Sequence, residues 1–222
     1  MTDKKGKLST ESYKGVRDFY PEDKYIQNYI FDVMGQTAEN FGYLDYSASV
    51  LEPIELYESK TSDEIVREQT YNFEDRGGRR VTLRPEMTPS VARMVAHRVR
   101  ELTFPLRLYT IANVFRYERP QRGRLREHWQ LNADIFGVSG VEAEVEIITL
   151  AEKVMKGFGA ESSDFEIRIN SRELMNVVLA DAGIEGEAAS AYVRLLDKLG
   201  KISDDDFKKK QREIIGEKTD PQ

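Results

Sequence analysis

Apolar residues recur at three- and four-residue steps through residues 22–41, and this spacing predicts an amphipathic helix. Pro21 fits the first turn of such a helix, and Gly42 stands where a C-terminal cap is expected. The preceding residues 1–13 are polar and are predicted to form a mobile tail. The stripe predicted to be buried consists of Ile26, Tyr29, Ile30, Val33, Met34 and Phe41.

Turn residues and alternating patterns predict several strands. A Gly77-Gly78 turn between NFED and RRVTLR indicates a hairpin. Residues 107–117 and 128–137 are predicted to be strands on either side of an arginine-rich loop. The segment FEIRIN, residues 165–170, alternates apolar and polar side chains and predicts one more strand.

Helix signals follow each of these strands. Thr88 and Pro89 are predicted as the N-cap and first residue of a helix that continues into SVARMVAHRVR. Ser139 and Glu142 have the spacing of a capping box ahead of another helix. Further helices are predicted at 172–182 and 187–199, and the acidic-then-basic last 20 or so residues indicate a solvated helix or a frayed tail. The buried stripe predicted for the helix after Glu142 consists of Val145, Ile148, Ala151, Val154, Met155 and Phe158.

The strand from His128 to Gly137 has two unlike faces. Successive side chains alternate across a strand, so one face is apolar and carries Trp129 and Ile135, with Leu131 and Ala133 between them. Such a strand is either half-solvated, with ordinary polar residues outside, or it forms the floor of a polar pocket. Its direct connection to the arginine-rich loop favours the pocket, because one bound molecule could touch both. The polar face carries His128, Gln130, Asn132 and Asp134.

Charge separates this region from the rest of the chain. The 222 residues include 33 basic and 39 acidic side chains, and the net charge of −6 argues against bulk attraction to nucleic acid or an anionic membrane. Residues 116–127 nevertheless hold five arginines and two glutamates, a local surplus of three positive charges. Arginine suits phosphate because its planar fork donates parallel hydrogen bonds and stays charged. Arg116 is expected to be fixed in a strand, whereas Arg122, Arg124 and Arg126 are expected in a mobile loop around Gly123.

Residue usage excludes several classes of site. The absence of cysteine excludes disulfides and thiolate metal sites, and only two histidines argue against a zinc site. No apolar run approaches the roughly 20 residues needed to span a bilayer. We therefore expect a cytoplasmic protein with no membrane partner and no tightly bound cofactor or metal.

The stretch VFRYERPQRGRLREHWQLNADIFG, residues 114–137, resembles motif 2 of the class II aminoacyl-tRNA synthetases, in the form found in histidyl-tRNA synthetases. Three other pieces agree in order and spacing: KGVRDFYPED, YNFEDRGGRRVTLRPEMT and the helix containing EAEVEIITLA. The resemblance covers roughly residues 14–180 and is specific to the histidine group.

This resemblance implies an α+β fold, in which an antiparallel sheet of six or more strands is flanked by helices. It also implies a homodimer that activates histidine with ATP and Mg²⁺ and transfers it from histidyl-adenylate to tRNA(His). On this basis residues 14–200 would be the N-terminal part of the catalytic domain, and residues 201–222 a helical or frayed segment.

The resemblance also implies roles for individual residues. Arg116 would bind the α-phosphate of ATP and the carboxylate of histidine, and would offset charge developing at phosphorus. Glu118 would lie near the adenine amino group, and Arg124 would help to hold the nucleotide or the tRNA acceptor end. The residues implied for histidine are Glu86, Thr88 and Gln130 at its α-amino group and Asp134 at its imidazole.

The chain departs from the family pattern in three places. Asp134 stands where glutamate is common, so its carboxylate is one methylene shorter. Ser49 aligns with a proline that supports the dimer contact, and Pro53 is displaced. The chain also ends before motif 3, the RGLDYY-like signature and an anticodon-binding domain, so we expect a fragment that is inactive alone. Two other functions remain open: a synthetase-like regulatory subunit of ATP phosphoribosyltransferase, and a synthetase-like module that senses tRNA.

Overall fold

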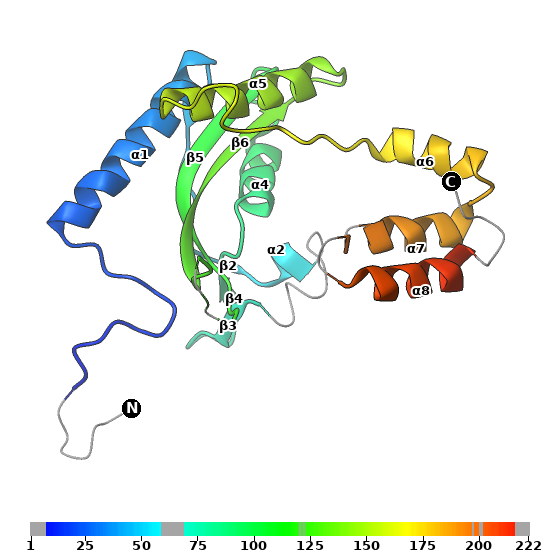
Figure 1. Cartoon of the computed structure of the whole chain (residues 1–222). Helices are drawn as coiled ribbons and strands as arrows, with labels where there is room; N and C mark the ends of the chain where they lie inside the picture. The colour runs from blue at the N-terminus through cyan, green and yellow to red at the C-terminus, as the bar shows by residue number, and fades with distance from the viewer. Residues whose placement is uncertain are drawn as a thin grey trace. The chain divides into compact units, whose positions relative to one another are not determined.

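The computed structural model describes residues 8–58, 69–119, 121, 123–196, 198–199 and 202–215. Its contacts divide the chain into two compact units, Met1–Phe165 and Glu166–Gln222 (Figure 1). The boundary predicted from the sequence, after residue 200, does not coincide with this division. Residues 165–170 form neither helix nor strand.

A three-stranded sheet forms the centre of the first unit. Its order is β1 (Leu44–Asp45), β5 (Leu106–Phe115) and β6 (Glu127–Phe136). Strands β5 and β6 pair antiparallel along their whole length, whereas β1 runs parallel to β5. The two long strands predicted around the arginine-rich loop are therefore confirmed, with ends shifted by one or two residues.

A second three-stranded sheet has the order β2 (Leu51–Pro53), β4 (Arg80–Leu83) and β3 (Tyr71–Glu74), and all its pairings are antiparallel. The predicted Gly77-Gly78 hairpin is confirmed. Asp75 Oδ1 closes its turn by accepting hydrogen bonds from the backbone N–H groups of Gly77 (2.8 Å) and Arg79 (3.0 Å). The strands of the described residues thus form two small sheets, where the resemblance implied one sheet of six or more.

Helices cover both faces of the central sheet (Figure 1). On one face, α1 (Pro21–Asn40) and α5 (Glu142–Gly157) pack over a cluster that includes Ala38, Tyr109 and Leu150. On the other face, α4 (Thr88–Arg98) packs over a second cluster. A single-turn helix, α2 (Glu55–Glu58), follows β2. The buried residues of the second cluster are Tyr46, Met87, Val91, Val95, Ala112 and Val114.

The buried face of α1 differs from the predicted stripe. Ile26 and Tyr29 are 58% and 54% exposed, whereas Gln27, Gly35 and Ala38 are the buried residues. Gly35 allows a close approach to the sheet, because a Cβ at this position would lie 3.2 Å from the hydroxyl oxygen of Tyr109. The helix approaches the sheet through its small residues, and part of its apolar stripe is left at the surface.

The C-terminal cap predicted at Gly42 is confirmed, because Gly42 has a φ of +82° and the N–H of Tyr43 donates to the carbonyl of Ala38 at 3.2 Å. The N-caps predicted for α4 and α5 do not form. Met87 precedes α4 and Val141 precedes α5, and neither side chain accepts a capping hydrogen bond. The buried residues of α5 are Leu150 and Val154, and Leu150 was not part of the predicted stripe. Of that stripe, Val154 is buried, whereas Val145, Ala151 and Met155 are exposed.

The second unit is helical and consists of α6 (Arg172–Asp181), α7 (Gly186–Leu196) and α8 (Asp204–Ile215). These helices confirm the predicted ones, including a helix near the end of the chain. The strand predicted at residues 165–170 is wrong, because no described strand pairs with this segment, and Ile169 is 75% exposed. Within the described part of the chain, no helix has the length and apolar character needed to cross a membrane.

The buried side chain of Arg84 connects the two sheets of the first unit. Its Nε and Nη2 donate to the backbone oxygen (2.8 Å) and Oδ1 (2.9 Å) of Asn113 on β5. Its Nη1 donates to the carbonyl of Ala48, between β1 and β2, at 2.7 Å. Burial lowers the pKa of this guanidinium, and the hydrogen bonds to carbonyl oxygens replace the water that it has lost.

We predict that Arg84→Met lowers the free energy of unfolding by about 2–4 kcal/mol, because it leaves buried carbonyl groups without donors. Urea denaturation measures this loss. Arg80→Met is the matched control, since Arg80 is exposed at the start of β4, the strand that Arg84 follows, and pairs with Glu58 at the surface. Equal effects of the two substitutions would contradict the role of Arg84.

Candidate functional site

The polar row of β6 lies on the α4 side of the central sheet. Leu131, Ala133 and Ile135 pack against the cluster beneath α1 and α5, and this confirms the predicted apolar face. Phe136, which points to the opposite face, packs against the cluster beneath α4. Because side chains alternate, the polar residues share the face of Phe136. This row consists of His128, Gln130, Asn132 and Asp134.

Residues of the RPEMT segment reach the same region. The Nε of Arg116 donates to the carbonyl of Pro85 at 3.0 Å, so the end of β5 is tied to the connection between β4 and α4. Glu86 is half-buried next to Pro85, and Thr88 is exposed at the first turn of α4. This hydrogen bond places Arg116 beside Pro85, the residue before Glu86, and the roles of Arg116, Glu86 and Thr88 stay predictions.

Arg116 offers a fixed cation with unused donors. Its backbone N–H donates to the carbonyl of Arg126 at 2.8 Å, and its side chain is half-buried. Among the described residues it forms no ion pair, and its hydrogen bond to Pro85 uses only Nε. The pKa of His128 is lowered by burial and, next, by the positive charge of Arg116, so these two side chains are close. An anion bound at this position would contact a guanidinium that is already held in place.

The other loop residues predicted to bind a nucleotide contact each other. Arg124 and Glu118 form an ion pair through Nε and Oε2. The Arg124 side chain is 56% exposed and that of Glu118 only 11%, so the carboxylate is the fixed partner. The loop closes on itself through hydrogen bonds between the backbones of Gln121 and Arg124, at 2.9 and 3.1 Å. Arg122 lies outside the described residues.

The expectation that Arg126 lies in a mobile loop is wrong. Its side chain is buried, with its guanidinium carbon 4.0 Å from the ring centroid of Tyr117. Its Nε donates to the carbonyl of Glu118 at 3.0 Å, and its backbone N–H donates to that of Gly15 at 2.6 Å. These contacts make Arg126 a structural residue. Tyr117, in FRYE, was the only contact close in the sequence that could have indicated this structural role, since Gly15 is far away in the sequence.

Asp134 is half-buried, and its Oδ2 is a buried acceptor without a hydrogen-bond partner among the described residues. The same is true of Oδ1 of Asn132, two residues earlier on the same face. Burial raises the pKa of Asp134. Acceptors of this kind are satisfied by a ligand that brings N–H donors or by water.

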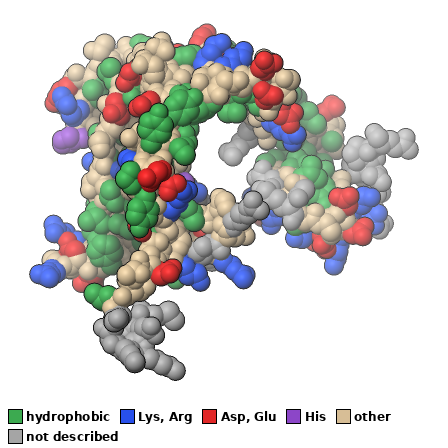
Figure 2. Space-filling view, turned by 60° about the vertical axis from the view of Figure 1, so that its left-hand side comes forward, with side chains coloured by type: hydrophobic (Ala, Val, Ile, Leu, Met, Phe, Trp, Pro, Cys, Tyr) green, Lys and Arg blue, Asp and Glu red, His purple; other side chains and the backbone are tan. Residues whose placement is uncertain are grey.

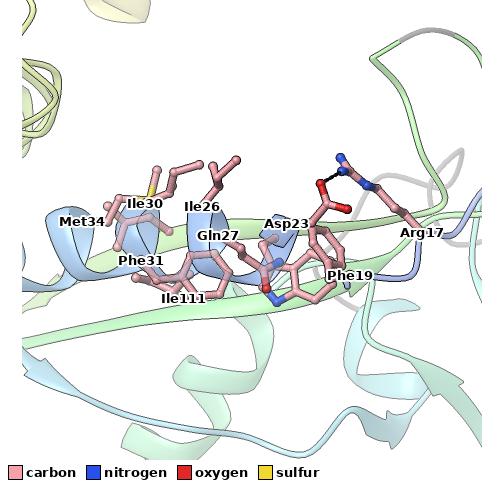
Figure 3. Close-up of a pocket in the computed structure, with 11 residues that line it drawn as sticks. Arg17, Phe19, Asp23, Ile26, Gln27, Ile30, Phe31, Met34 and Ile111 are labelled. Carbon is pink, nitrogen blue, oxygen red and sulfur yellow. Dashed lines mark hydrogen bonds and ion pairs between the residues drawn. The ribbon is translucent and has the colours of Figure 1, made fainter. Parts of the chain in front are cut away.

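An apolar groove of about 370 Å³ lies on the opposite side of the central sheet. Figure 3 shows Ile26, Phe31 and Met34 of α1 along it, together with Phe19 and an ion pair between Arg17 and Asp23 at 2.5 Å. Figure 2 shows that hydrophobic side chains also reach the surface of the first unit. Such a groove has few groups to bind phosphate, so the polar row is the better candidate for a site with charged ligands.

Comparison with known proteins gives a consistent result. A family model described as histidyl-tRNA synthetase matches residues 15–203. The histidine–tRNA ligase of Leptospira biflexa is 48% identical over 205 residues, which are 92% of this chain and 47% of that protein. The corresponding ligase of Thermoplasma volcanium is 45% identical over 202 residues, which are 90% and 46% of the two chains. The chain thus spans about half the length of these relatives.

Solved structures agree with these matches. A Bacillus halodurans protein described as an ATP phosphoribosyltransferase regulatory subunit/histidyl-tRNA synthetase superposes with a TM-score of 0.75 and 25% identity, covering 93% of this chain and 55% of that one. A histidyl-tRNA synthetase from Nostoc sp. PCC 7120 has the same TM-score at 22% identity, covering 96% of this chain and 49% of its own. The predicted α+β fold of the class II type, incomplete relative to these proteins, is confirmed.

We predict that Asp134→Asn stabilises the empty protein at neutral pH. A carboxyl whose pKa is higher in the folded than in the unfolded state binds more protons when folded, so its contribution to stability falls as pH rises above the ordinary value of 3.8. The asparagine does not ionise, so its advantage should be absent at about pH 3.5 and present at about pH 7. Urea denaturation at both values measures it, and an advantage that shrinks with rising pH would contradict the buried, unpaired state of Asp134.

Proposed function

The chain belongs to the histidyl-tRNA synthetase family, and we propose that it carries the ATP- and histidine-binding part of a histidine–tRNA ligase. In this reaction the histidine carboxylate attacks the α-phosphorus of ATP, pyrophosphate leaves, and the histidyl group then passes to tRNA(His). The observation that carries the proposal is Arg116, held by Pro85 at the end of a row of polar side chains. The activity and substrates of the whole protein are part of this proposal.

Arg116 would act on the reacting phosphate. Negative charge grows on the oxygens of the α-phosphate as the carboxylate attacks, and a guanidinium already in place stabilises that charge without having to reorganise. The hydrogen bond from Nε to Pro85 holds the group, and neither Nη atom has a partner among the described residues, so both can reach a phosphate or carboxylate oxygen. ATP would enter as its Mg²⁺ complex, and the metal would arrive as part of the substrate.

Arg124 and Glu118 would change partners when ATP binds. Arg124 is the more exposed member of their ion pair, so it can turn toward a phosphate with little loss of packing. Glu118 would then accept a hydrogen bond from the adenine amino group. The ion pair would hold both residues near these positions before the nucleotide arrives.

Histidine would lie along the polar row. Its ammonium group would be held by acceptors on Glu86, Thr88 and Gln130, at the end of the row near Arg116, and its imidazole would reach Asp134. An aspartate is one methylene shorter than the glutamate common in the family, so the ring would have to approach more closely or bind through a water. Burial of the acceptor strengthens either contact.

A regulatory subunit of ATP phosphoribosyltransferase is the second candidate, because the Bacillus halodurans structure carries that description beside histidyl-tRNA synthetase. Retention of ERPQRGR, with Arg116 and Arg124, favours the ligase, since an effector-binding subunit has no reacting phosphate to stabilise. A tRNA-sensing module and a cytoplasmic location stay predictions from the sequence.

We predict that Arg116→Ala slows histidine-dependent exchange between ATP and pyrophosphate by about 10²-fold, or roughly 3 kcal/mol. The assay would use a fusion in which this chain replaces the matching part of the Leptospira biflexa ligase. Arg98→Ala is the control, because Arg98 is an exposed arginine at the far end of α4 that pairs with Glu101.

Loss of less than tenfold would contradict the role of Arg116 in this proposal. A fusion without any exchange, whose chain nevertheless binds ATP, would favour the regulatory alternative. The 222-residue chain alone should charge no tRNA, because charge at the transition state would be stabilised from one side only.

We also propose a homodimer that forms through α1. Tyr25, Ile26 and Tyr29 are 77%, 58% and 54% exposed, and Ile26 lines the apolar groove. Side chains of this size rarely stay in water without a partner when they are contiguous. Self-association would cover them, even though Ser49 replaces the proline that supports this contact in the family.

We predict that Ile26→Lys weakens self-association of the chain at least tenfold, because it would bury an unpaired charge. Sedimentation velocity over a concentration series measures the change. Val99→Lys is the matched control, since Val99 is 50% exposed at the end of α4, away from this surface. If Ile26→Lys leaves the dimer intact, or if the unsubstituted chain is monomeric throughout the series, this interface is wrong.

A further inference from the structure

Three buried polar atoms without a hydrogen-bond partner lie on the α4 side of the central sheet. They are the hydroxyl of Tyr46, Oδ1 of Asn132 and Oδ2 of Asp134. Folded proteins pair nearly all of their buried polar atoms, because an unpaired one costs free energy. Only five such side-chain atoms occur among the described residues, so three on one face point to a ligand.

Strand register brings Tyr46 to the polar row. Asp45 pairs with Tyr109, and the backbone N–H of Tyr46 donates to the carbonyl of Tyr109 at 2.9 Å. The next residue on β5 is Thr110, which pairs with Asn132 on β6. Tyr46 and Asn132 are thus level with each other on either side of Thr110.

The hydroxyl of Tyr46 is also close enough to Asp134 to respond to its charge. Burial is the largest cause of the raised pKa of Tyr46, and the negative charge of Asp134 is the next. Tyr46 packs in the cluster with Met87 and Val91, so its ring is fixed beneath α4. The three polar groups therefore surround one small region of the sheet.

The spacing of the two acceptors suits one ring. Asn132 and Asp134 are two residues apart on one face of a strand, or about 6.7 Å along it. A protonated imidazole carries N–H groups on opposite edges of its ring, whereas a neutral one carries a single N–H. Two acceptors at this separation can receive one hydrogen bond from each edge.

We propose that Asn132 and Tyr46 complete the imidazole pocket and that this pocket selects the protonated ring of histidine. Asp134 accepts one ring N–H and Oδ1 of Asn132 accepts the other. Tyr46 is a positioning residue, whose hydroxyl donates to the Asp134 carboxylate once the ring is seated. This inference rests on histidine being the substrate, as proposed above.

The test is an NMR titration of the 222-residue chain with L-histidine in the millimolar range, at about pH 6 and about pH 8, on either side of the imidazole pKa near 6.5. The unsubstituted chain should bind histidine at least tenfold more weakly at the higher pH. Asn132→Leu should weaken binding at the lower pH at least tenfold and remove most of this pH dependence. Tyr46→Phe should weaken binding severalfold.

Tyr43→Phe is the matched control. Tyr43 also has a buried hydroxyl, but it packs in the cluster beneath α1 and α5, and, after burial, Glu146 affects its pKa more than Asp134 does. Asn132→Leu and Tyr46→Phe each remove an unpaired buried polar group, so each should keep or raise the melting temperature, by about 2–4 °C where it rises. Only those on the α4 side should change histidine binding.

The outcomes separate this inference from the proposed function. Suppose that the unsubstituted chain binds histidine and that the two variants, Asn132→Leu and Tyr46→Phe, bind it equally well at both pH values. The proposed pocket would then be wrong, whereas the histidine site would stand. Equal weakening by Tyr43→Phe would also overturn the inference. A chain that does not respond to histidine at either pH would overturn both the inference and the assignment of histidine.

Discussion

The hydrogen bonds of one buried guanidinium, that of Arg84, fix the relation between the two sheets of the first unit. A cation removed from water is costly unless its donors are paired, and here the carbonyls of Ala48 and Asn113 and the side chain of Asn113 accept them. The backbone of Arg84 also pairs with Val50 and Phe115. Because Pro85 follows directly and accepts from Arg116, the position of the candidate catalytic arginine depends on this connection.

The two faces of the central sheet differ in the side chains that they bury. Beneath α1 and α5 the sheet is packed with apolar side chains, and Tyr109 closes the contact with a hydrogen bond to Glu39 at 2.9 Å. Beneath α4 three buried polar atoms have no hydrogen-bond partner among the described residues, including one oxygen of Asp134, whose pKa is raised by burial. Such groups lower the stability of an empty protein, and a ligand or water can supply the missing hydrogen bonds.

Local patterns predicted the elements that depend on neighbouring residues. The alternation of β6 and the Gly77-Gly78 hairpin were predicted correctly, because a strand's two faces and a tight turn are encoded within a few residues. The strand at residues 165–170 was wrong, because a strand also needs a partner. The face of α1 that is buried could not be predicted either, since it includes Gly35, which meets Tyr109, a residue far away in the sequence.

The candidate site was predictable in composition and less so in detail. The polar row and the basic loop followed from alternation and charge, whereas roles such as those of Glu86 and Gln130 came from a family resemblance and stay predictions. Arg84 and Arg126 belong to the same motifs, yet their partners are carbonyl groups distant in sequence, so no local pattern marks them as structural. Tyr46 was not predicted as a site residue, because an aromatic ring in an apolar segment usually indicates an ordinary core residue.

The most direct test is a crystal structure of the chain with L-histidine and Mg²⁺-ATP at saturating concentration. The account predicts the imidazole on the α4 side of β6, between Asn132 and Asp134, with the α-phosphate at the Nη atoms of Arg116. Histidine in the apolar groove lined by Phe31, Met34 and Trp129, or a nucleotide that makes no contact with Arg116, would contradict it.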